Sequence, residues 1–555
     1  MSSSSKAFER ENYMQDSVED VPYQCELDYF QEDKSFCESD LLFYEELQIL
    51  AHFGALDDLY LDKASPPFQA CRDGFFATPS SNKAQDWQPN EEKRPYAFPS
   101  AAMEILRHYR SRAGAADGGL ERDEGKRQSQ RASPPTLLSV SQLIELAVRS
   151  FIHSNSENGN DFHLSAVIHQ DKTPFSSLSR GESEDIRLVQ DLLSCARAVC
   201  NHRYACASEL LKEFSKLSSG STNVMQRLVY CFAESLRDKI EIETRGSVNT
   251  RPLQLIPPIS ATASFIEKLH FNQVMQFAGV QAVLDHLSSR RKVHVVDFGL
   301  YGGLRHSILM QALATSSERP LQHLKITAVA TQSNLLTEEE AGARLENLAK
   351  SLNLSFSFHV ISFEDILSLQ QSVLRLDPEE TVVVQAAHAL RFMIPKLENL
   401  MTVIRSIDPH VMIITEVEAN VDSPVFVNRF VEALFYFGAG FDYLQYCLKD
   451  DLAARAYVES KLYSPSIRHI VAAEEEERKF RFVGINFWRE TFARFGMEET
   501  ELSKLALNHA NSVLNKFDCR DSCKLGLNGN TLIVGWKDTP IFSLSAWKFQ
   551  KIRTI

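Results

Sequence analysis

Through the second half of the chain, short apolar runs of strand length alternate with stretches whose apolar residues recur every three or four positions. The first run is Val293-His294-Val295-Val296-Asp297, which ends at an acid and leads into a glycine-rich turn. A helical pattern then covers Leu304–Leu313. This order predicts the first strand, turn and helix of an open α/β sheet, in which the turn usually holds a ligand.

Four more apolar runs follow, and helical patterns separate them. One helical pattern begins with Thr337-Glu338-Glu339-Glu340, a capping-box sequence in which the hydroxyl and the carboxylate satisfy free backbone N–H groups. Strand–helix alternation implies right-handed crossovers and predicts a parallel sheet covered on both faces. The predicted strands are Lys325–Ala330, Phe356–Ile361, Thr381–Ala386 and Val411–Val417.

The C-terminal end has a different pattern. Two strand-like runs, Thr531–Trp536 and Ile541–Phe549, lie on either side of the short turn Lys537–Pro540, which predicts an antiparallel hairpin. Five parallel strands completed by such a hairpin predict an α/β, Rossmann-like, doubly wound sheet of the class I methyltransferase type. That comparison concerns the fold alone.

Helical patterns without strands precede the sheet and predict an α-helical cap. Their heptad-like spacing is not sustained over the three or four heptads that a coiled coil needs, which favours packing within the chain over a dimerising seam. A further helical block runs from Phe265 to Leu287. The apolar faces consist of Ile186, Val189, Leu193, Ala196 and Cys200, and of Met225, Leu228, Phe232 and Leu236.

Residues 1–135 show no sustained period, and we predict that they are largely disordered. The net charge of −14 is concentrated in this region, because residues 1–63 contain 16 Asp and Glu against 4 Lys and Arg. Acids interleave with Phe, Tyr and Leu around a predicted short helix at Leu41–Phe53, as in activation segments. A tail that docks on its own domain is an equally supported alternative. Residues 136–185 are predicted to be a helical lead-in and linker.

The ten cysteines, with no apolar signal segment after Met1, predict reduced thiols in a nuclear or cytosolic compartment. Cys519 and Cys523 are four positions apart instead of three, and Cys195, Cys200 and Cys206 fit a helical pattern. Core packing is therefore favoured over zinc, and no metal site is predicted. No apolar run reaches the roughly 18 residues that a membrane span requires.

The turn after the first strand is a candidate cofactor site. Asp297, Gly299 and Gly303 fit a methyltransferase fingerprint, but Tyr301 takes the position of the middle glycine. Gly302 is a further candidate residue of the pocket. The second strand is followed by Thr331-Gln332-Ser333, with no carboxylate for ribose hydroxyls. We therefore predict a vestigial pocket without catalytic residues or cofactor, in which Asp297 caps the turn or the following helix. His294 is predicted to be a core residue.

The chain resembles the GRAS family of plant transcriptional regulators, because Val293–Asp297 is similar to the VHIID motif and four further regions follow the family's order. These regions are leucine-rich region I over 186–240, the VHIID region over 262–330, leucine-rich region II over 337–369, the PFYRE region over 380–472 and the SAW region over 473–549. The matching motif residues are Val293, His294, Val295, Val296, Asp297, Arg468, Glu477, Arg478, Trp488, Trp536, Ser545, Ala546 and Trp547. The resemblance implies a GRAS-like domain over 186–549.

Several positions depart from the family's pattern. Gly302-Gly303 stands where a glutamine–glycine pair is common, Glu476 replaces a glycine, and Gln385–His388 replaces an Asn-Ser pair. No DELLA or TVHYNP-like sequence occurs in residues 1–135. The chain is thus expected to be a divergent member, outside the gibberellin-repressor type.

The resemblance implies a nuclear regulator of plant development or signalling that acts as a protein-binding scaffold or co-regulator. Its implied partners are other GRAS proteins, in homo- or heterodimers, and DNA-binding transcription factors, contacted through the leucine-rich helices. Two alternatives stay open: a small-molecule-binding or methyltransferase-like enzyme, and a direct sequence-specific DNA binder. Direct DNA contact has weak support, because the basic clusters Arg290–Lys292 and Arg107–Arg131 are short. Trp488, Trp536 and Trp547 are expected to pack in the core.

Overall fold

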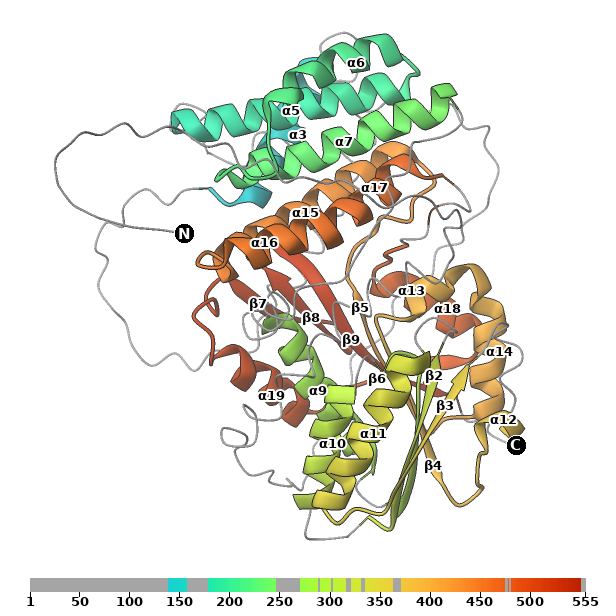
Figure 1. Cartoon of the computed structure of the whole chain (residues 1–555). Coiled ribbons are helices and arrows are strands. Elements are labelled where there is room, and N and C mark those ends of the chain that lie inside the picture. The colour runs from blue at the N-terminus through green and yellow to red at the C-terminus, as the bar shows by residue number, and fades with distance from the viewer. Residues whose placement is uncertain are drawn as a thin grey trace, which may run out of the picture. The chain divides into compact units, whose positions relative to one another are not determined.

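A nine-stranded sheet, parallel in one half and antiparallel in the other, forms the centre of the computed structural model (Figure 1). All the described residues belong to one compact unit. They comprise 138–156, 178–245, 270–287, 290–300, 303–315, 321–330, 335–362, 371–474, 478 and 481–550. The expectations for residues 1–135, Tyr301, Gly302, Thr331–Ser333 and Glu477 fall outside these ranges.

The parallel half has the order β3-β2-β1-β4-β5. In the register, Asp297 at the end of β1 lies beside Ala328 of β2 and Gln385 of β4, so the carboxyl ends of these strands meet at one edge. The five predicted parallel strands are confirmed to within two residues at each end. Their bounds are β1 Lys292–Asp297, β2 His323–Ala330, β3 Phe356–Ser362, β4 Thr381–Ala387 and β5 Val411–Val417.

The antiparallel half completes the sheet. β9 (Thr539–Phe549) pairs with β5 and with β8 (Thr531–Trp536), which confirms the predicted hairpin. β9 begins at Thr539, because the turn is shorter than predicted and Lys537 in it has a φ of 51°. Two strands were not predicted: β6 (Met497–Thr500), which pairs with β9, and β7 (Cys523–Asn528), which pairs with β8.

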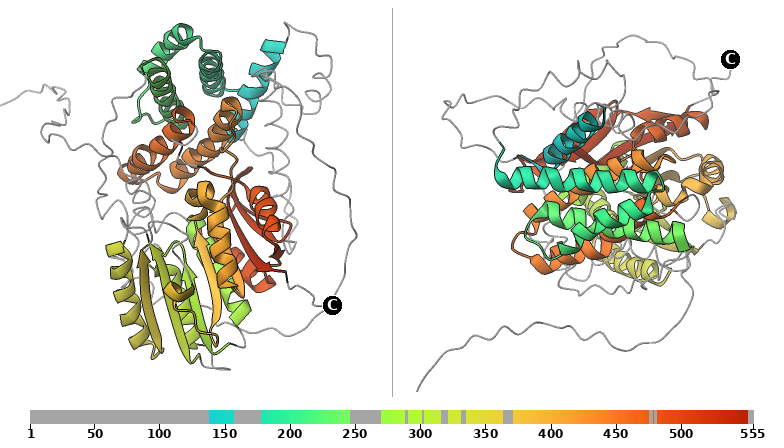
Figure 2. Two further views of the ribbon diagram at one scale, coloured as in Figure 1. Left: turned by 90° about the vertical axis from the view of Figure 1, so that its right-hand side faces the viewer. Right: turned by 90° about the horizontal axis from the view of Figure 1, so that it is seen from above.

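Helices cover both faces of the sheet, as the apolar runs predict (Figure 2). Val293 and Val295 of β1 belong to the core that includes residues of α9, α10, α11 and α19, whereas Val296 belongs to the core that includes residues of α14 and α18. Successive side chains of a strand point to opposite faces, so both faces are buried. The bounds are α9 His270–Leu287, α10 Leu304–Thr315, α11 Leu335–Ser351, α14 Leu397–Ile407, α18 Ile485–Arg494 and α19 Lys504–Leu514.

The predicted capping box at Thr337 is wrong. Helix α11 begins at Leu335, so Thr337 lies inside its first turn and is not the residue before it. The helix thus starts before the residue that the sequence pattern placed at its N-cap. A capping box does form at α5 (Arg180–Cys200), where the Ser179 hydroxyl accepts from the Glu182 N–H and the Glu182 carboxylate accepts from the Ser179 N–H.

An α-helical cap forms the top of the molecule in the view of Figure 1. It consists of α3 (Val140–Ser156), α5, α6 (Tyr204–Glu213) and α7 (Val224–Arg245) and packs on α15 (Phe426–Cys447) and α17 (Ser464–Ala472) in one apolar core. The leucine-rich faces of α5 and α7 are buried in that core, as predicted. Shorter helices are α12 Gln371–Leu374, α13 Leu390–Met393 and α16 Leu452–Val458, with a π-helical turn at Glu459–Tyr463 and 3-10 turns at Phe214–Lys216 and Ile394–Lys396.

The core-packing prediction holds for Cys195, which is buried on α5, but is wrong for Cys206, which is exposed. The chain turns after Cys200, so Cys206 lies on a separate helix, α6, with its own buried face. Among the helices of the described ranges, none is both long enough and apolar enough to cross a membrane.

Candidate functional site

The turn after β1 is built around the carboxylate of Asp297, which is fully buried at the strand's end. One carboxylate oxygen accepts the Gly299 backbone N–H at 2.7 Å. The other accepts Nη2 of Arg305 at 3.0 Å and Nε2 of His306 at 2.6 Å, both from the first turn of α10. Asp297 therefore has the turn-capping contact expected from the sequence, and it also holds α10 against β1.

The protonation states of this cluster follow from its burial and its charges. Burial raises the pKa of Asp297, but the Arg305 guanidinium and the hydrogen bonds from His306 and Gly299 outweigh that effect and lower the pKa to about 2. Burial lowers the pKa of His306, although Asp297 opposes this. At neutral pH we therefore assign a carboxylate to Asp297 and a neutral imidazole to His306 that donates from Nε2. Both oxygens of Asp297 are engaged by groups of the same chain.

Gly303 serves helix packing at this turn. Its φ is 86°, a left-handed conformation that favours glycine. A Cβ atom built there would lie 3.0 Å from Cδ1 of Leu345 on α11, so the Leu345 side chain would have to shift by a few tenths of an ångström. Gly299 is buried beside Asp297. The expectation that Tyr301 fills the cofactor's space concerns a residue outside the described ranges and stays a prediction.

His294 lies inside β1 and not at the turn. It is fully buried, and its Nε2 is 2.7 Å from Oγ1 of Thr327 on β2. Nδ1 is 3.2 Å from a carboxylate oxygen of Glu380, but burial lowers the pKa of His294 to about 3, so the imidazole is neutral at physiological pH and this contact is not an ion pair. His294 thus has the environment of a core residue.

The three tryptophans of the SAW region are buried in two different cores. Trp488 and Trp547 both contact Phe492, with ring centroids 5.5 and 4.9 Å away. Trp536 lies in the other core and donates from Nε1 to Asp442 at 2.9 Å. Ser545 accepts from Nε1 of Trp547 at 2.9 Å, and Ala546 beside it is buried.

The two arginines of the motif set lie on the cap side. Arg468 on α17 pairs with Asp238 on α7 at 2.6 Å. Arg478 is buried and donates to the Ser423 carbonyl at 2.9 Å and to the Asp422 carboxylate at 3.1 Å. Burial lowers the pKa of Arg478. The motif residues therefore do not converge on one catalytic centre, because Asp297, the tryptophans and the arginines occupy separate parts of the fold.

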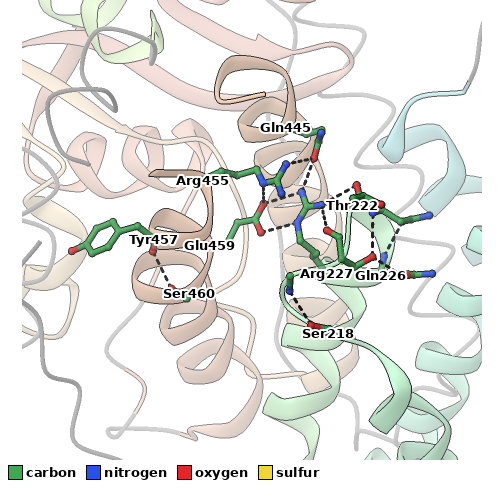
Figure 3. A network of polar contacts seen from close by, with 12 residues as sticks. Ser218, Thr222, Gln226, Arg227, Gln445, Arg455, Tyr457, Glu459 and Ser460 are labelled. Carbon is green, nitrogen blue, oxygen red and sulfur yellow. Dashed lines mark hydrogen bonds and ion pairs between the residues drawn. The ribbon is translucent and has the colours of Figure 1, made fainter. Parts of the chain in front are cut away.

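A buried polar network between the cap and the sheet-side helices was not predicted (Figure 3). Arg227 on α7 donates to both carboxylate oxygens of Glu459, at 2.8 and 3.0 Å, and to Oε1 of Gln445 at 2.9 Å. The same guanidinium donates to the carbonyl of Ser221 at 2.8 Å. Nη1 of Arg455 also donates to Gln445, at 2.8 Å. Burial raises the pKa of Glu459, and Arg227 opposes that shift.

The sequence contained one signal for this network, the basic residue Arg227 within the apolar pattern of α7. Its partners Gln445 and Glu459 lie 218 and 232 positions further along the chain, so a local pattern could not reveal them. A bidentate arginine–carboxylate pair fixes two planar groups in one geometry. The network therefore links α7 of the cap to α15, to α16 and to the π-helical turn that follows α16.

Comparison with known proteins agrees with the resemblance found from the motifs. The model of the GRAS domain family matches residues 188–548. DELLA protein GAI1 of Vitis vinifera is 28% identical over 377 residues, 65% of this chain and 62% of that protein. DELLA protein RGL1 of Arabidopsis thaliana is 29% identical over 375 residues, 66% of this chain and 71% of that protein. This chain thus spans less than two thirds of the length of the first relative.

The fold has a counterpart among solved structures. The crystal structure of SCL7 in Oryza sativa superimposes with a TM-score of 0.57 at 24% sequence identity, over 65% of this chain and 99% of that chain. The similarity supports the architecture described above.

Proposed function

Because this chain belongs to the GRAS domain family and is a plant GRAS regulatory protein, we propose that it acts in the nucleus as a protein-binding scaffold or co-regulator of transcription. Its proposed partners are other GRAS proteins, in homo- or heterodimers, and DNA-binding transcription factors. The proposed GRAS-like domain, residues 186–549, contains the matched range. The acidic segment within residues 1–135 is the proposed activation or partner-binding region.

The observation that carries this proposal is the engaged carboxylate of Asp297. In nucleotide-binding relatives of this fold, the turn after the first strand leaves its backbone open to the cofactor. Here both carboxylate oxygens accept from Gly299, Arg305 and His306 of the same chain. A carboxylate engaged in this way by its own chain supports a role in binding proteins over a role in catalysis.

The outer face of the cap supports a charged contact surface. Along α5, Arg180 pairs with Glu184 and Arg187 with Asp191, and the two arginine side chains are 93% and 82% exposed. The apolar face of the same helix is already buried within the chain. A partner of the folded cap therefore meets charges on α5, which chiefly determine specificity and association rate.

Proximity labelling in plant nuclei tests the proposal with the full chain fused to a biotin ligase. We expect biotin on GRAS proteins and on DNA-binding transcription factors. The double variant Arg180→Glu with Arg187→Glu is expected to lose part of this labelling. Lys350→Glu with Arg405→Glu, an equal charge change at exposed positions of α11 and α14, is the control and should keep it. A nuclear fusion that labels no transcription factor would contradict the scaffold role.

A further inference from the structure

One imidazole and three thiols meet where α9 begins, α15 ends and β7 begins. His270 is the first residue of α9, Cys447 the last of α15, and Cys523 the first of β7, while Cys519 lies in the turn before β7. Sγ of Cys519 is 2.9 Å from Nδ1 of His270 and 3.5 Å from Sγ of Cys523. Sγ of Cys447 is 4.0 Å from the same ring nitrogen.

We propose that this cluster is a structural zinc site in which His270, Cys447, Cys519 and Cys523 are the four ligands. In tetrahedral zinc sites the Zn–S and Zn–N bonds are about 2.3 and 2.0 Å long, which separates neighbouring ligand atoms by about 3.5 to 3.8 Å. The ligand atoms of His270, Cys447 and Cys519 all lie within 4.8 Å of one another. The separations of 2.9 and 4.0 Å from Nδ1 of His270 lie about half an ångström on either side of the tetrahedral edge. Sγ of Cys523 is 3.5 Å from Sγ of Cys519 but lies outside the group of three, so it would have to move toward the other two ligands to complete the tetrahedron.

The donor set suits zinc. Thiolate sulfur with imidazole nitrogen selects Zn²⁺ over Mg²⁺ and Ca²⁺, which prefer oxygen ligands. Four protein ligands would leave no open coordination position for a substrate, so the ion would hold structure and would not catalyse a reaction. It would link three elements whose ligands lie 177 and 249 positions from His270 along the chain.

The ligands must lose their protons when the ion binds. Three Zn–S bonds and one Zn–N bond would form as the thiols of Cys447, Cys519 and Cys523 release three protons to solvent. Metal binding is expected to strengthen as the pH rises.

Tyr443 and Phe517 orient the ligands. The buried Tyr443 hydroxyl accepts the His270 backbone N–H at 2.8 Å. The Phe517 ring lies over the His270 ring, with centroids 3.6 Å apart. Such outer contacts are typical of metal sites. The spacing of Cys519 and Cys523 favoured packing in the core. Packing alone does not explain why the His270 ring nitrogen lies next to the sulfur atoms of Cys447 and Cys519.

The test uses the full-length chain, purified with all thiols reduced, and measures bound zinc after dialysis. We expect one Zn²⁺ per chain in the wild type and none in Cys519→Ser. The exposed Cys206→Ser and the buried Cys231→Ser variants are matched controls and should keep the ion. Tyr443→Phe, which keeps the ring but removes the hydroxyl, should weaken zinc binding by about tenfold.

Replacement of zinc by Co²⁺ in the wild type tests the ligands without a variant that could misfold. Tetrahedral Co²⁺ with thiolate ligands absorbs strongly in the visible range, and we expect such a spectrum. A wild-type chain that binds no stoichiometric zinc, a pale octahedral cobalt spectrum, or a folded Cys519→Ser chain that keeps its zinc would each overturn the proposal.

Discussion

Arg227 and Glu459, which lie 232 positions apart in the sequence, form a two-pronged ion pair with Nε and Nη2 2.8 and 3.0 Å from the two carboxylate oxygens. Their side chains are 1% and 6% exposed. Arg227 belongs to the cap, and Glu459 begins the π-helical turn that follows α16. Because both side chains are almost fully buried, removing either one would leave the charge of the other without its main partner inside the protein. The contact between the cap and this turn therefore depends on both residues.

The variant Arg227→Ala is expected to lower the free energy of unfolding by about 3 to 5 kcal/mol, because it leaves the Glu459 carboxylate buried without its main partner. Urea unfolding followed by circular dichroism measures the loss. Arg187→Ala is the control: it removes an arginine from an ion pair on α5 whose side chains are 82% and 52% exposed, and it should change stability little. Equal losses in both variants would contradict a special role for the buried pair.

The variant Asp297→Asn is expected to reduce stability by about 2 kcal/mol near pH 7, because a folded-state pKa near 2 lies roughly two units below the ordinary value. A lowered carboxyl pKa contributes stability above the unfolded-state value, and this contribution is lost as the pH falls from about 4 toward 2. The stability difference between wild type and variant should therefore shrink over this window.

Urea unfolding of the two proteins at a series of pH values measures this effect. The difference between them must be used, because His306 also has a lowered pKa and disfavours the folded state when it is protonated at low pH. A difference that stays constant down to pH 2 would show that the charge of Asp297 does not stabilise the turn.

The sequence predicted the fold well where the apolar signal was continuous. β5 is buried at all seven positions, and its run Val411–Val417 was predicted with these bounds. β6 has one apolar residue in four, and β7 contains Gly526, so neither carried a strand pattern. These strands form because β8 and β9 offer free edges to them, which is a property of the assembled sheet.

In the candidate site, too, the features predicted from the sequence are those whose residues are adjacent in the chain. Asp297 was predicted because strand, acid and turn are adjacent in the chain, although its partners Arg305 and His306 were not. The Arg227–Glu459 pair and the His270–Cys519 contact join positions 232 and 249 residues apart. Such pairs arise only when the sheet and the cap have assembled, so spacing rules applied to neighbouring cysteines did not find the proposed zinc ligands.

The variant Gly303→Ala is expected to destabilise the protein by about 1 to 3 kcal/mol, because alanine is strained at positive φ and its Cβ would meet Leu345 at 3.0 Å. Thermal unfolding measures the change. Gly181→Ala is the matched control, since a Cβ at that position in the first turn of α5 meets no atom within 4 Å. Alanine there should keep or slightly raise the stability. An equal effect at both glycines would refute the packing role of Gly303.

Calorimetry of the full-length chain with S-adenosylmethionine is expected to show no heat of binding, while a class I methyltransferase measured in parallel should show its normal affinity. The physical reason is that the Asp297 carboxylate is held by Arg305 and His306, at 3.0 and 2.6 Å, in the place where such a fold presents its cofactor turn. Replacing Arg305 by Ala tests whether the closed turn alone prevents binding. Micromolar affinity in the wild type would contradict the scaffold proposal, whereas affinity gained only in Arg305→Ala would identify the arginine as the group that closes an otherwise competent pocket.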